Sequence, residues 1–129
     1  MRTPCEVVVR QVLPAFRAIV AKSLIENHSF SQKRAAGVLG TTQASISYYL
    51  NSKRGAGLID RLKEIEMVGK TASKMAEDMA SDLLSMPFEA ILAFCDLCKG
   101  LRTKEIVCTL HSNQAQLPDD CKICPEKII

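Results

Sequence analysis

The chain lacks any apolar run long enough to span a bilayer as a helix, which takes about 18 residues or more. Its start also lacks the layout of a signal peptide, because Glu6, Arg10 and Arg17 interrupt the apolar stretch. These two absences predict a cytoplasmic protein that makes no use of a membrane.

Catalytic arrangements are also missing. His28 and His111 have no carboxylate at a spacing that suggests a proton relay, and no alternation of strands and helices surrounds the cysteines as in a thioredoxin-like enzyme. We therefore expect a protein that is not an enzyme. A thiol redox protein, or a scaffold that recruits a protein partner through the tail, is the alternative from a different class.

Positive charge is unevenly distributed along the 129 residues. The net charge is +3, but residues 1–57 hold eight Lys or Arg against two acids, whereas residues 58–94 hold four against seven. Lysine and arginine neutralise phosphate and supply most non-specific affinity for DNA. The basic half is the expected footprint of a nucleic-acid partner, and an ordinary solvated surface is the alternative.

Two short helices joined at a glycine are predicted within residues 30–55. Ser31 is a good N-cap for a helix over residues 32–39, and Gly40 stands where that helix must stop. Thr41 or Thr42 can then cap a second helix over residues 43–50.

The second helix turns Ile46 and Leu50 inward and leaves small or amide side chains on its outer side: Gln43, Ala44, Ser45, Ser47 and Tyr48. Such side chains can approach base edges in the major groove without steric conflict. Asn51, Lys53 and Arg54 follow at positions suited to phosphate. The other interpretation of the pair is a scaffold within a helical bundle.

The run SQKRAAGVLGTTQASIS resembles the helix-turn-helix of the lambda-repressor-like (Xre/Cro) transcriptional regulators, over roughly residues 11–57. The opening MRTPCEVVVRQVLPAFRAIVAK and the cysteine-rich tail are similar to a group of archaeal predicted regulators of this class. The resemblance implies sequence-specific binding of double-stranded DNA. It also implies that the first glutamine of each helix, Gln32 and Gln43, contacts DNA, one at the backbone and the other at a base.

Helices are also expected before this pair. Thr3 and Glu6 form a capping box around Pro4, so a short helix begins at Thr3, and Pro14 either starts a second helix or kinks the first. An apolar stripe follows through about Glu26: Phe16, Ile19, Val20 and Leu24.

Apolar or small residues recur alternately every four and three positions over residues 58–86: Leu58, Leu62, Ile65, Gly69, Ala72, Ala76, Met79, Leu83 and Met86. This period is typical of a coiled-coil seam. It predicts a long helix, broken near Gly69 if anywhere, that pairs two chains into a homodimer. The alternative is an amphipathic helix that lies on the chain's own N-terminal domain.

The last third of the chain predicts less regular structure. A helix is expected over residues 88–99, with Gly100 as its end. Ile106 and Val107 suggest a short strand. Residues 113–120 suggest a loop.

Five of the six cysteines lie in this last third: Cys95, Cys98, Cys108, Cys121 and Cys124. The outer four form two C-x-x-C pairs, a layout in which each pair offers two thiolates to one metal centre. Buried cysteines without a metal are the alternative.

The metal is either Zn²⁺ or iron in an iron–sulfur cluster. Zinc on the two pairs leaves Cys108 over, with His111 as a possible ligand. The surplus thiol, and the value of a redox-sensitive cofactor to a regulator, favour the cluster; zinc suits a structural brace. Cys5 stands apart and is expected to be a small core residue rather than a ligand.

The sequence thus predicts an all-α fold in three parts. Residues 1–57 form a DNA-binding helix-turn-helix domain, residues 58–86 a dimerisation helix, and residues 87–129 a cysteine-rich metal module. The function expected is transcriptional regulation that responds to redox or metal status.

Overall fold

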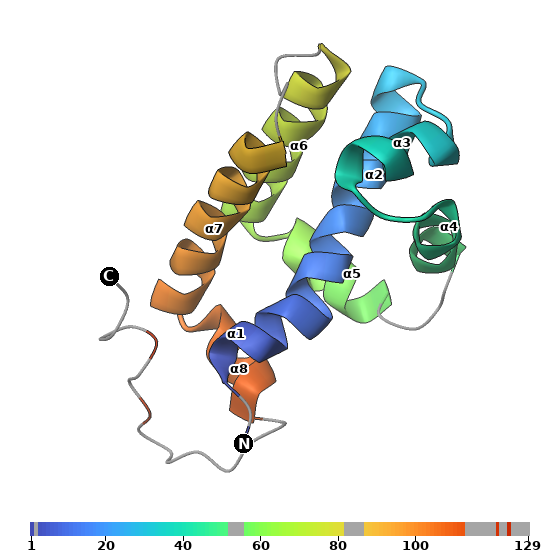
Figure 1. Ribbon diagram of the computed structural model, residues 1–129. Coiled ribbons are helices and arrows are strands. Elements are labelled where there is room, and N and C mark those ends of the chain that lie inside the picture. Colours follow the sequence, from blue (N-terminus) through green and yellow to red (C-terminus); the bar gives the residue numbers. More distant parts are fainter. Residues whose placement is uncertain (2, 52–55, 82–86, 113–120, 122–123, 125–129) are drawn as a thin grey trace.

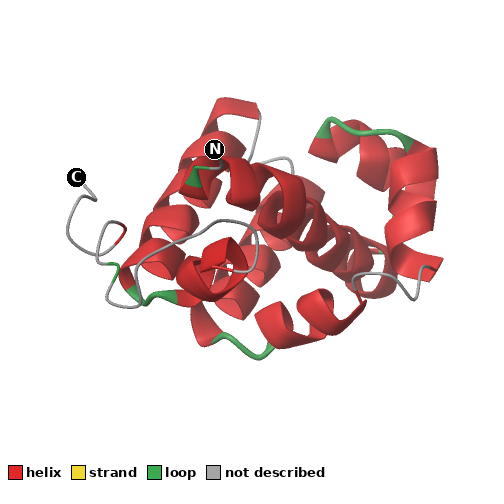
Figure 2. Ribbon diagram, turned by 90° about the horizontal axis from the view of Figure 1, so that it is seen from below, coloured by secondary structure: helices red, strands yellow, loops and turns green. Residues whose placement is uncertain are grey.

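The computed structural model describes residues 1, 3–51, 56–81, 87–112, 121 and 124. Every regular element within these ranges is a helix, and Figure 2 shows no strand among them. The prediction of an all-α fold is therefore confirmed.

The N-terminal part is one long rod: α1 (Pro4–Val7), the π-helical turn η1 (Val8–Val12) and α2 (Leu13–His28) follow one another without a break (Figure 1). The Thr3 hydroxyl accepts a hydrogen bond from the Glu6 amide at 3.3 Å, which confirms the predicted start. Pro14 lies in the first turn of α2, which agrees with the predicted helix start, although α2 follows η1 without an intervening loop. Because proline has no amide hydrogen and crowds the preceding turn, the wider π turn before it lets the helix continue.

The described part of the long helix predicted over residues 58–86 is helical but broken, and the break is not near Gly69 as predicted. The segment forms α5 (Ala56–Lys63) and α6 (Glu66–Ala80), and the break falls at Ile65, whose backbone is extended, rather than at Gly69. The break allows α6 to turn back and pack against α2.

Residues of the predicted coiled-coil seam pack within the chain's own hydrophobic core. Leu62, Ala72, Ala76 and Met79 are all buried in the same core as α2, whereas Leu83 and Met86 lie outside the described residues. Alanines at the contact allow close approach of the helices. Leu58, Ile65 and Gly69 are half-buried, so most of the described seam faces the chain's own core, as the intramolecular alternative predicts.

Two further corrections concern α7 (Pro87–Thr103) and α8 (Ile106–Ser112). Gly100 does not end α7: it lies inside the helix, where an added Cβ would come within 3.0 Å of the Met67 sulfur on α6. Ile106 and Val107 begin α8 instead of a strand, because Val107 is buried in the helical core. The predicted loop over residues 113–120 lies outside the described residues.

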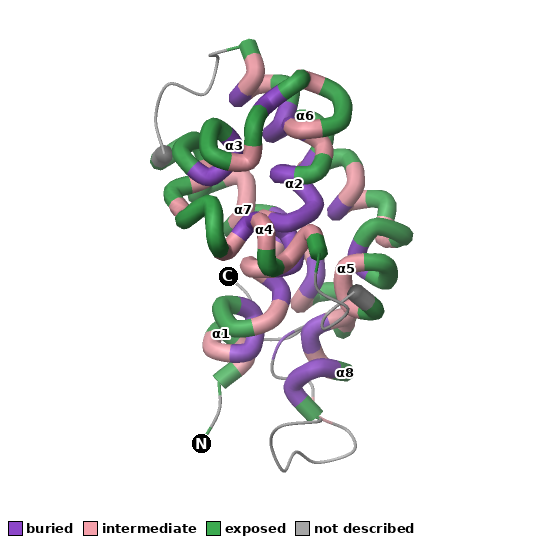
Figure 3. The backbone as a smooth tube through the Cα atoms, turned by 90° about the vertical axis from the view of Figure 1, so that its right-hand side faces the viewer, coloured by how far each residue is buried: buried purple, intermediate pink, exposed green. Residues whose placement is uncertain are grey.

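A single cluster of buried side chains runs from α1 to α8 and includes all of the predicted stripe on α2. The rings of Phe16 on α2 and Phe94 on α7 lie 5.3 Å apart. Purple segments along α2 and α8 in Figure 3 mark this core. All three predicted segments of the chain contribute to it.

Candidate nucleic-acid interface and thiol cluster

Helices α3 (Gln32–Leu39) and α4 (Gln43–Asn51) form a helical hairpin, called here the α3–α4 hairpin. Its caps are those expected from the sequence. The Ser31 hydroxyl accepts a hydrogen bond from the Arg34 amide at 3.1 Å, and the Thr42 hydroxyl accepts one from the Ser45 amide at 3.1 Å. Between them Gly40 has φ of 69°, a left-handed conformation that glycine adopts at little cost.

The hairpin is fixed to the rod by its buried side chains. Ala35, Ala36 and Ile46 are buried in the core shared with α2, and Leu39 and Leu50 pack partly against it. The two alanines let α3 lie close to its neighbours. The opposite side of α4 therefore has a set orientation relative to the rest of the molecule (Figure 1).

The outer face of α4 is only partly as expected. Gln43, Ala44 and Tyr48 are exposed. Ser45 and Ser47 are half-buried, and each hydroxyl accepts a hydrogen bond within the chain, from Thr42 at 2.9 Å and from Asn51 at 3.3 Å, respectively. The two serines thus contribute to the order of the helix as well as to its surface.

The remaining residues expected to contact DNA differ in exposure and in position. Gln32 is half-buried at the start of α3, and Asn51 is exposed at the end of α4. Lys53 and Arg54 lie outside the described residues.

The hairpin carries no negative side chain. Residues 27–59 contain no Asp or Glu, and the ion pairs between described residues do not involve Lys33 or Arg34. The Arg34 guanidinium lies over the Phe30 ring, 3.9 Å from its centroid, a favourable cation–π arrangement. This contact is not among the features predicted from the sequence, although the i, i+4 spacing of the two residues suggests it.

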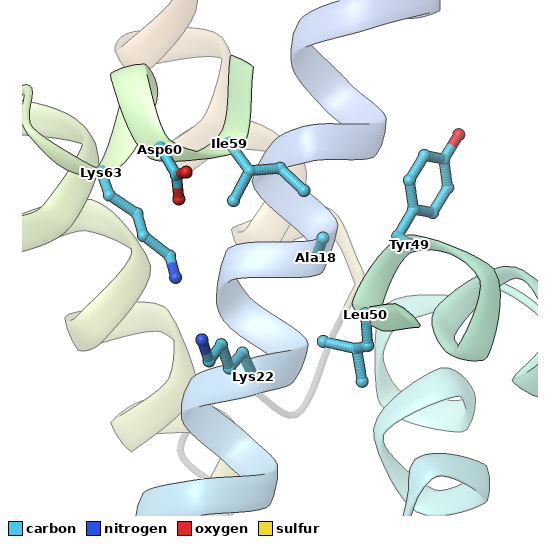
Figure 4. A pocket seen from close by; sticks show the side chains of 7 residues that line it. All are labelled: Ala18, Lys22, Tyr49, Leu50, Ile59, Asp60 and Lys63. Carbon is cyan, nitrogen blue, oxygen red and sulfur yellow. The ribbon is translucent and has the colours of Figure 1, made fainter. Parts of the chain in front are cut away.

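A cavity of about 170 Å³ lies where α4 ends, between α2 and α5. Figure 4 shows Lys22 and Lys63 reaching toward each other across it, with Asp60 beside Lys63. Burial, reinforced by the neighbouring Lys22, lowers the pKa of Lys63. No spacing in the sequence indicates this pair, because the two lysines come from helices that meet only in the folded chain.

Cysteines from separate parts of the chain gather around Arg102. Its Nη1 lies 3.9 Å from Cys5 Sγ on α1, and Cys124 is near enough to raise the pKa of Arg102. Cys98 is one helical turn before it on α7, and Cys124 is near enough to Cys108 on α8 to raise the pKa of that thiol. We call Cys5, Cys98, Cys108 and Cys124 the thiol cluster.

The cluster differs from the expected pairing of the two C-x-x-C segments. Cys98 and Cys124 belong to it, but Cys95 is exposed and Cys121 is half-buried near Cys108. Cys5, which was expected to lie in the core away from any site, is exposed and adjoins Arg102. Among the described residues, no three His, Cys, Asp or Glu side chains are arranged to hold a metal ion.

Burial and the neighbouring charges shift the pKa values of Cys98, Cys108 and Arg102 in the thiol cluster. Burial raises the pKa of Cys98, which Arg102 opposes, and burial also raises the pKa of Cys108. Burial acts to lower the pKa of Arg102, but Cys124 and the other nearby sulfur charges outweigh it and the pKa is raised. Arg102 Nε is buried and has no hydrogen-bond partner among the described residues.

Comparisons of the chain with protein-family models, with curated proteins and with solved structures find no match. Within the described ranges, none of the helices is both long and apolar enough to cross a membrane. The case for a function therefore depends on the chemistry of the α3–α4 hairpin and of the thiol cluster.

Proposed function

We propose that the protein is a sequence-specific DNA-binding transcriptional regulator that inserts the first turn of α4 into the major groove. The observation that carries this proposal is the α3–α4 hairpin itself. Its second helix is capped at Thr42 and presents exposed Gln43 and Ala44 at its start, and residues 27–59 are free of acidic side chains. A helix start with small and amide side chains is suited to base edges, and a surface free of carboxylates does not repel the DNA phosphates.

The contacts divide into two kinds. Gln43 reads a base, because a glutamine amide can pair with adenine through two hydrogen bonds. Gln32 at the start of α3, together with Lys53 and Arg54 after α4, contacts the backbone and acts on all sequences alike. Asn51 and Tyr48 lie at the edge of the same surface.

The direct test is selection of binding sites from a random pool of double-stranded DNA by the full chain, followed by fluorescence anisotropy at a fixed salt concentration. The proposal requires enrichment of a sequence, with affinity for it at least about 1,000-fold above random DNA. A pool that stays random after repeated selection would refute base readout and favour the scaffold interpretation of the hairpin.

We further propose that the C-terminal cysteines bind a metal, either an iron–sulfur cluster or Zn²⁺, with the cluster favoured for a sensor and zinc for a brace. The gathering of thiols around Arg102 supports this, since thiolates are the preferred ligands of both. A visible absorption spectrum and elemental analysis of anaerobically purified protein separate the two. Sensing then requires that loaded and metal-free protein differ in affinity for the selected DNA.

A homodimer, which would double the readout over two half-sites, needs a surface other than the buried seam. We propose that two copies pair through α7. Phe88, Ile91 and Leu92 are 61, 56 and 49% exposed, respectively, and Cys95 continues the same face one turn later. Spacings of three and four residues give a helix stripe that can pack against its own copy across a two-fold axis.

The rival from another class, a thiol redox protein, is less well supported. Reactive cysteines need an exposed thiol whose pKa is low. Cys108 has a raised pKa, and its neighbour Cys124 is 3% exposed. These properties do not suit a nucleophile that must meet a substrate.

A further inference from the structure

We infer that a cavity between α2, α3, α6 and α7 binds a small monocarboxylate with an apolar tail, such as a medium-chain fatty acid, and that Arg17 recognises the carboxylate. We call this space the four-helix cavity. Its volume is about 290 Å³. The inference goes beyond the proposed recognition of DNA and does not depend on it.

The four-helix cavity lies where α2 packs against both α3 and α6, and where α6 packs against α7 (Figure 1). Phe16 and Met79 give it buried apolar walls, whereas Val38 and Ile91, 42 and 56% exposed, respectively, also line it. The cavity therefore combines an apolar interior with an opening to solvent. Sites for small molecules are typically of this kind, formed between helices and lined by apolar side chains with few polar groups.

Small and adaptable residues make room in the cavity. Gly37 and Gly40 form part of its wall on α3, and a Cβ added at either position would meet no atom within 4 Å. Met75 and Met79 form part of the wall on α6. Methionine side chains are unbranched and polarisable, so they can adjust to the shape of an occupant. A ligand can thus enter without a shift of the backbone.

Arg17 sets the charge of the occupant. Among the described residues that line the cavity it is the only charged one, and the others are apolar. It is half-buried on α2, and the ion pairs between described residues do not involve it. A guanidinium group can bind a carboxylate through two parallel hydrogen bonds. One positive charge beside an apolar wall matches a molecule with one negative charge and an apolar tail.

A second copy of the chain is the other candidate occupant, because Ile91 also belongs to the face of α7 through which we propose that two copies pair. That face is apolar where it adjoins the cavity. An apolar surface laid over Arg17 would take its charge out of water without supplying a partner, which is costly. A monocarboxylate fills the cavity and pairs with the guanidinium at once, so the structure favours the small molecule.

Octanoate and methionine signals test the site in the full chain. Met75 and Met79 line the cavity, whereas Met67 does not and instead adjoins Gly100 on α7. Protein labelled with ¹³C at the methionine methyl groups is titrated with octanoate in the absence of DNA, and the methyl signals are followed by NMR. Single methionine-to-leucine variants assign each signal.

We expect the signals of Met75 and Met79 to shift saturably with octanoate while that of Met67 stays in place. Octanol, which has the same tail and no charge, should bind at least about 5-fold more weakly, because it cannot form the charged hydrogen bonds. Absence of a shift at Met75 and Met79, equal shifts at all three methionines, or equal affinity for octanol and octanoate would each overturn the inference.

Replacing Arg17 with glutamine tests the recognition of charge. Arg17→Gln should lower the affinity for octanoate at least about 5-fold and leave the affinity for octanol unchanged. Arg61→Gln is the matched control, since Arg61 is exposed on α5 and does not line the cavity. Unchanged octanoate affinity in Arg17→Gln, with circular dichroism showing a folded protein, would contradict the assigned role of Arg17.

Titrations at several protein concentrations separate the ligand from a second copy. We expect the affinity for octanoate to be the same at each concentration. An affinity that falls as the protein dimerises, monitored by sedimentation velocity, would identify the second copy as the occupant and overturn the inference. Because DNA is absent throughout, a failure of the DNA proposal leaves these results unchanged.

Discussion

Cys5 and Arg102, 97 residues apart in the sequence, meet at 3.9 Å between sulfur and guanidinium nitrogen. One belongs to the first helical turn of the chain and the other to the end of α7. The contact therefore joins the start of the long N-terminal rod to the cysteine-rich part of the chain.

Replacing Arg102 with methionine keeps the length of the side chain and removes its charge. We expect Arg102→Met to weaken metal binding about 10-fold or more, because the excess negative charge of the thiolates is left without compensation. Arg102→Lys should recover part of the affinity. Cobalt titrations monitored by the charge-transfer band measure both, and equal affinity in all three proteins would remove Arg102 from the site.

Replacing Gln43 with alanine should remove a base contact and leave the fold intact, since the side chain is exposed. The expected loss on the selected DNA sequence is about 1 to 3 kcal/mol, with unchanged affinity for random DNA. Anisotropy titrations at one salt concentration measure both values. Lys74→Ala, an exposed change on α6, is the control. An equal loss on both DNAs would identify Gln43 as a backbone contact instead.

Two glycines of the α3–α4 hairpin offer a matched pair for stability. Gly40 has a left-handed backbone and open space around its Cβ position, so Gly40→Ala should lower the free energy of unfolding by about 1 to 2 kcal/mol through backbone strain alone. Gly37 also has open space but lies within α3, and Gly37→Ala should raise stability by about 0.5 to 1 kcal/mol. Urea unfolding followed by circular dichroism gives both. Changes of the same sign would contradict the capping role of Gly40.

Introducing a charge on α7 tests the proposed pairing surface. Ile91→Asp should shift the protein from dimer to monomer, because the side chain is exposed in the single chain and apolar contact would be lost in the pair. Sedimentation velocity over a range of concentrations measures the change. Val9→Asp is the control, an equally exposed apolar residue on η1. Leu62→Asp should instead unfold the chain, since Leu62 is buried. A wild type that is monomeric throughout would exclude the pairing.

The Lys22 and Lys63 pair predicts a dependence of stability on pH. Since the pKa of Lys63 is lowered by folding, its charged form is disfavoured in the native state. That cost is present below the folded pKa and disappears as pH rises from the folded toward the unfolded value. Lys63→Gln should therefore gain stability relative to the wild type at neutral pH, and the gain should shrink at alkaline pH. Lys74→Gln is the control for loss of a lysine charge. A difference that does not vary with pH would contradict the coupling.

Features set by neighbours in sequence were predictable. Ser31, Gly40 and Thr42 act on residues within one helical turn, so the bounds of α3 and α4 follow from the sequence alone. The Thr3 cap was predictable for the same reason.

Features that depend on residues distant in sequence could not be predicted from the sequence. A four-and-three spacing on α6 suits any helix of matching surface, and nothing in residues 58–86 says that the partner is α2 of the same chain. Gly100 resembles a helix end because its closeness to Met67 arises only when α6 and α7 pack together. The gathering of Cys5 with the later cysteines depends on the packing of α1 against α8.

The break between α5 and α6 has a consequence for how the protein is made. Because the break lets α6 pack against α2 of the same chain, the core of the single chain is complete without pairing through this segment, and folding need not wait for a partner to cover the seam. A leucine zipper in the same segment would have tied folding to encounter between two chains. Here a newly synthesised copy can complete its core alone, and any later assembly is a separate equilibrium.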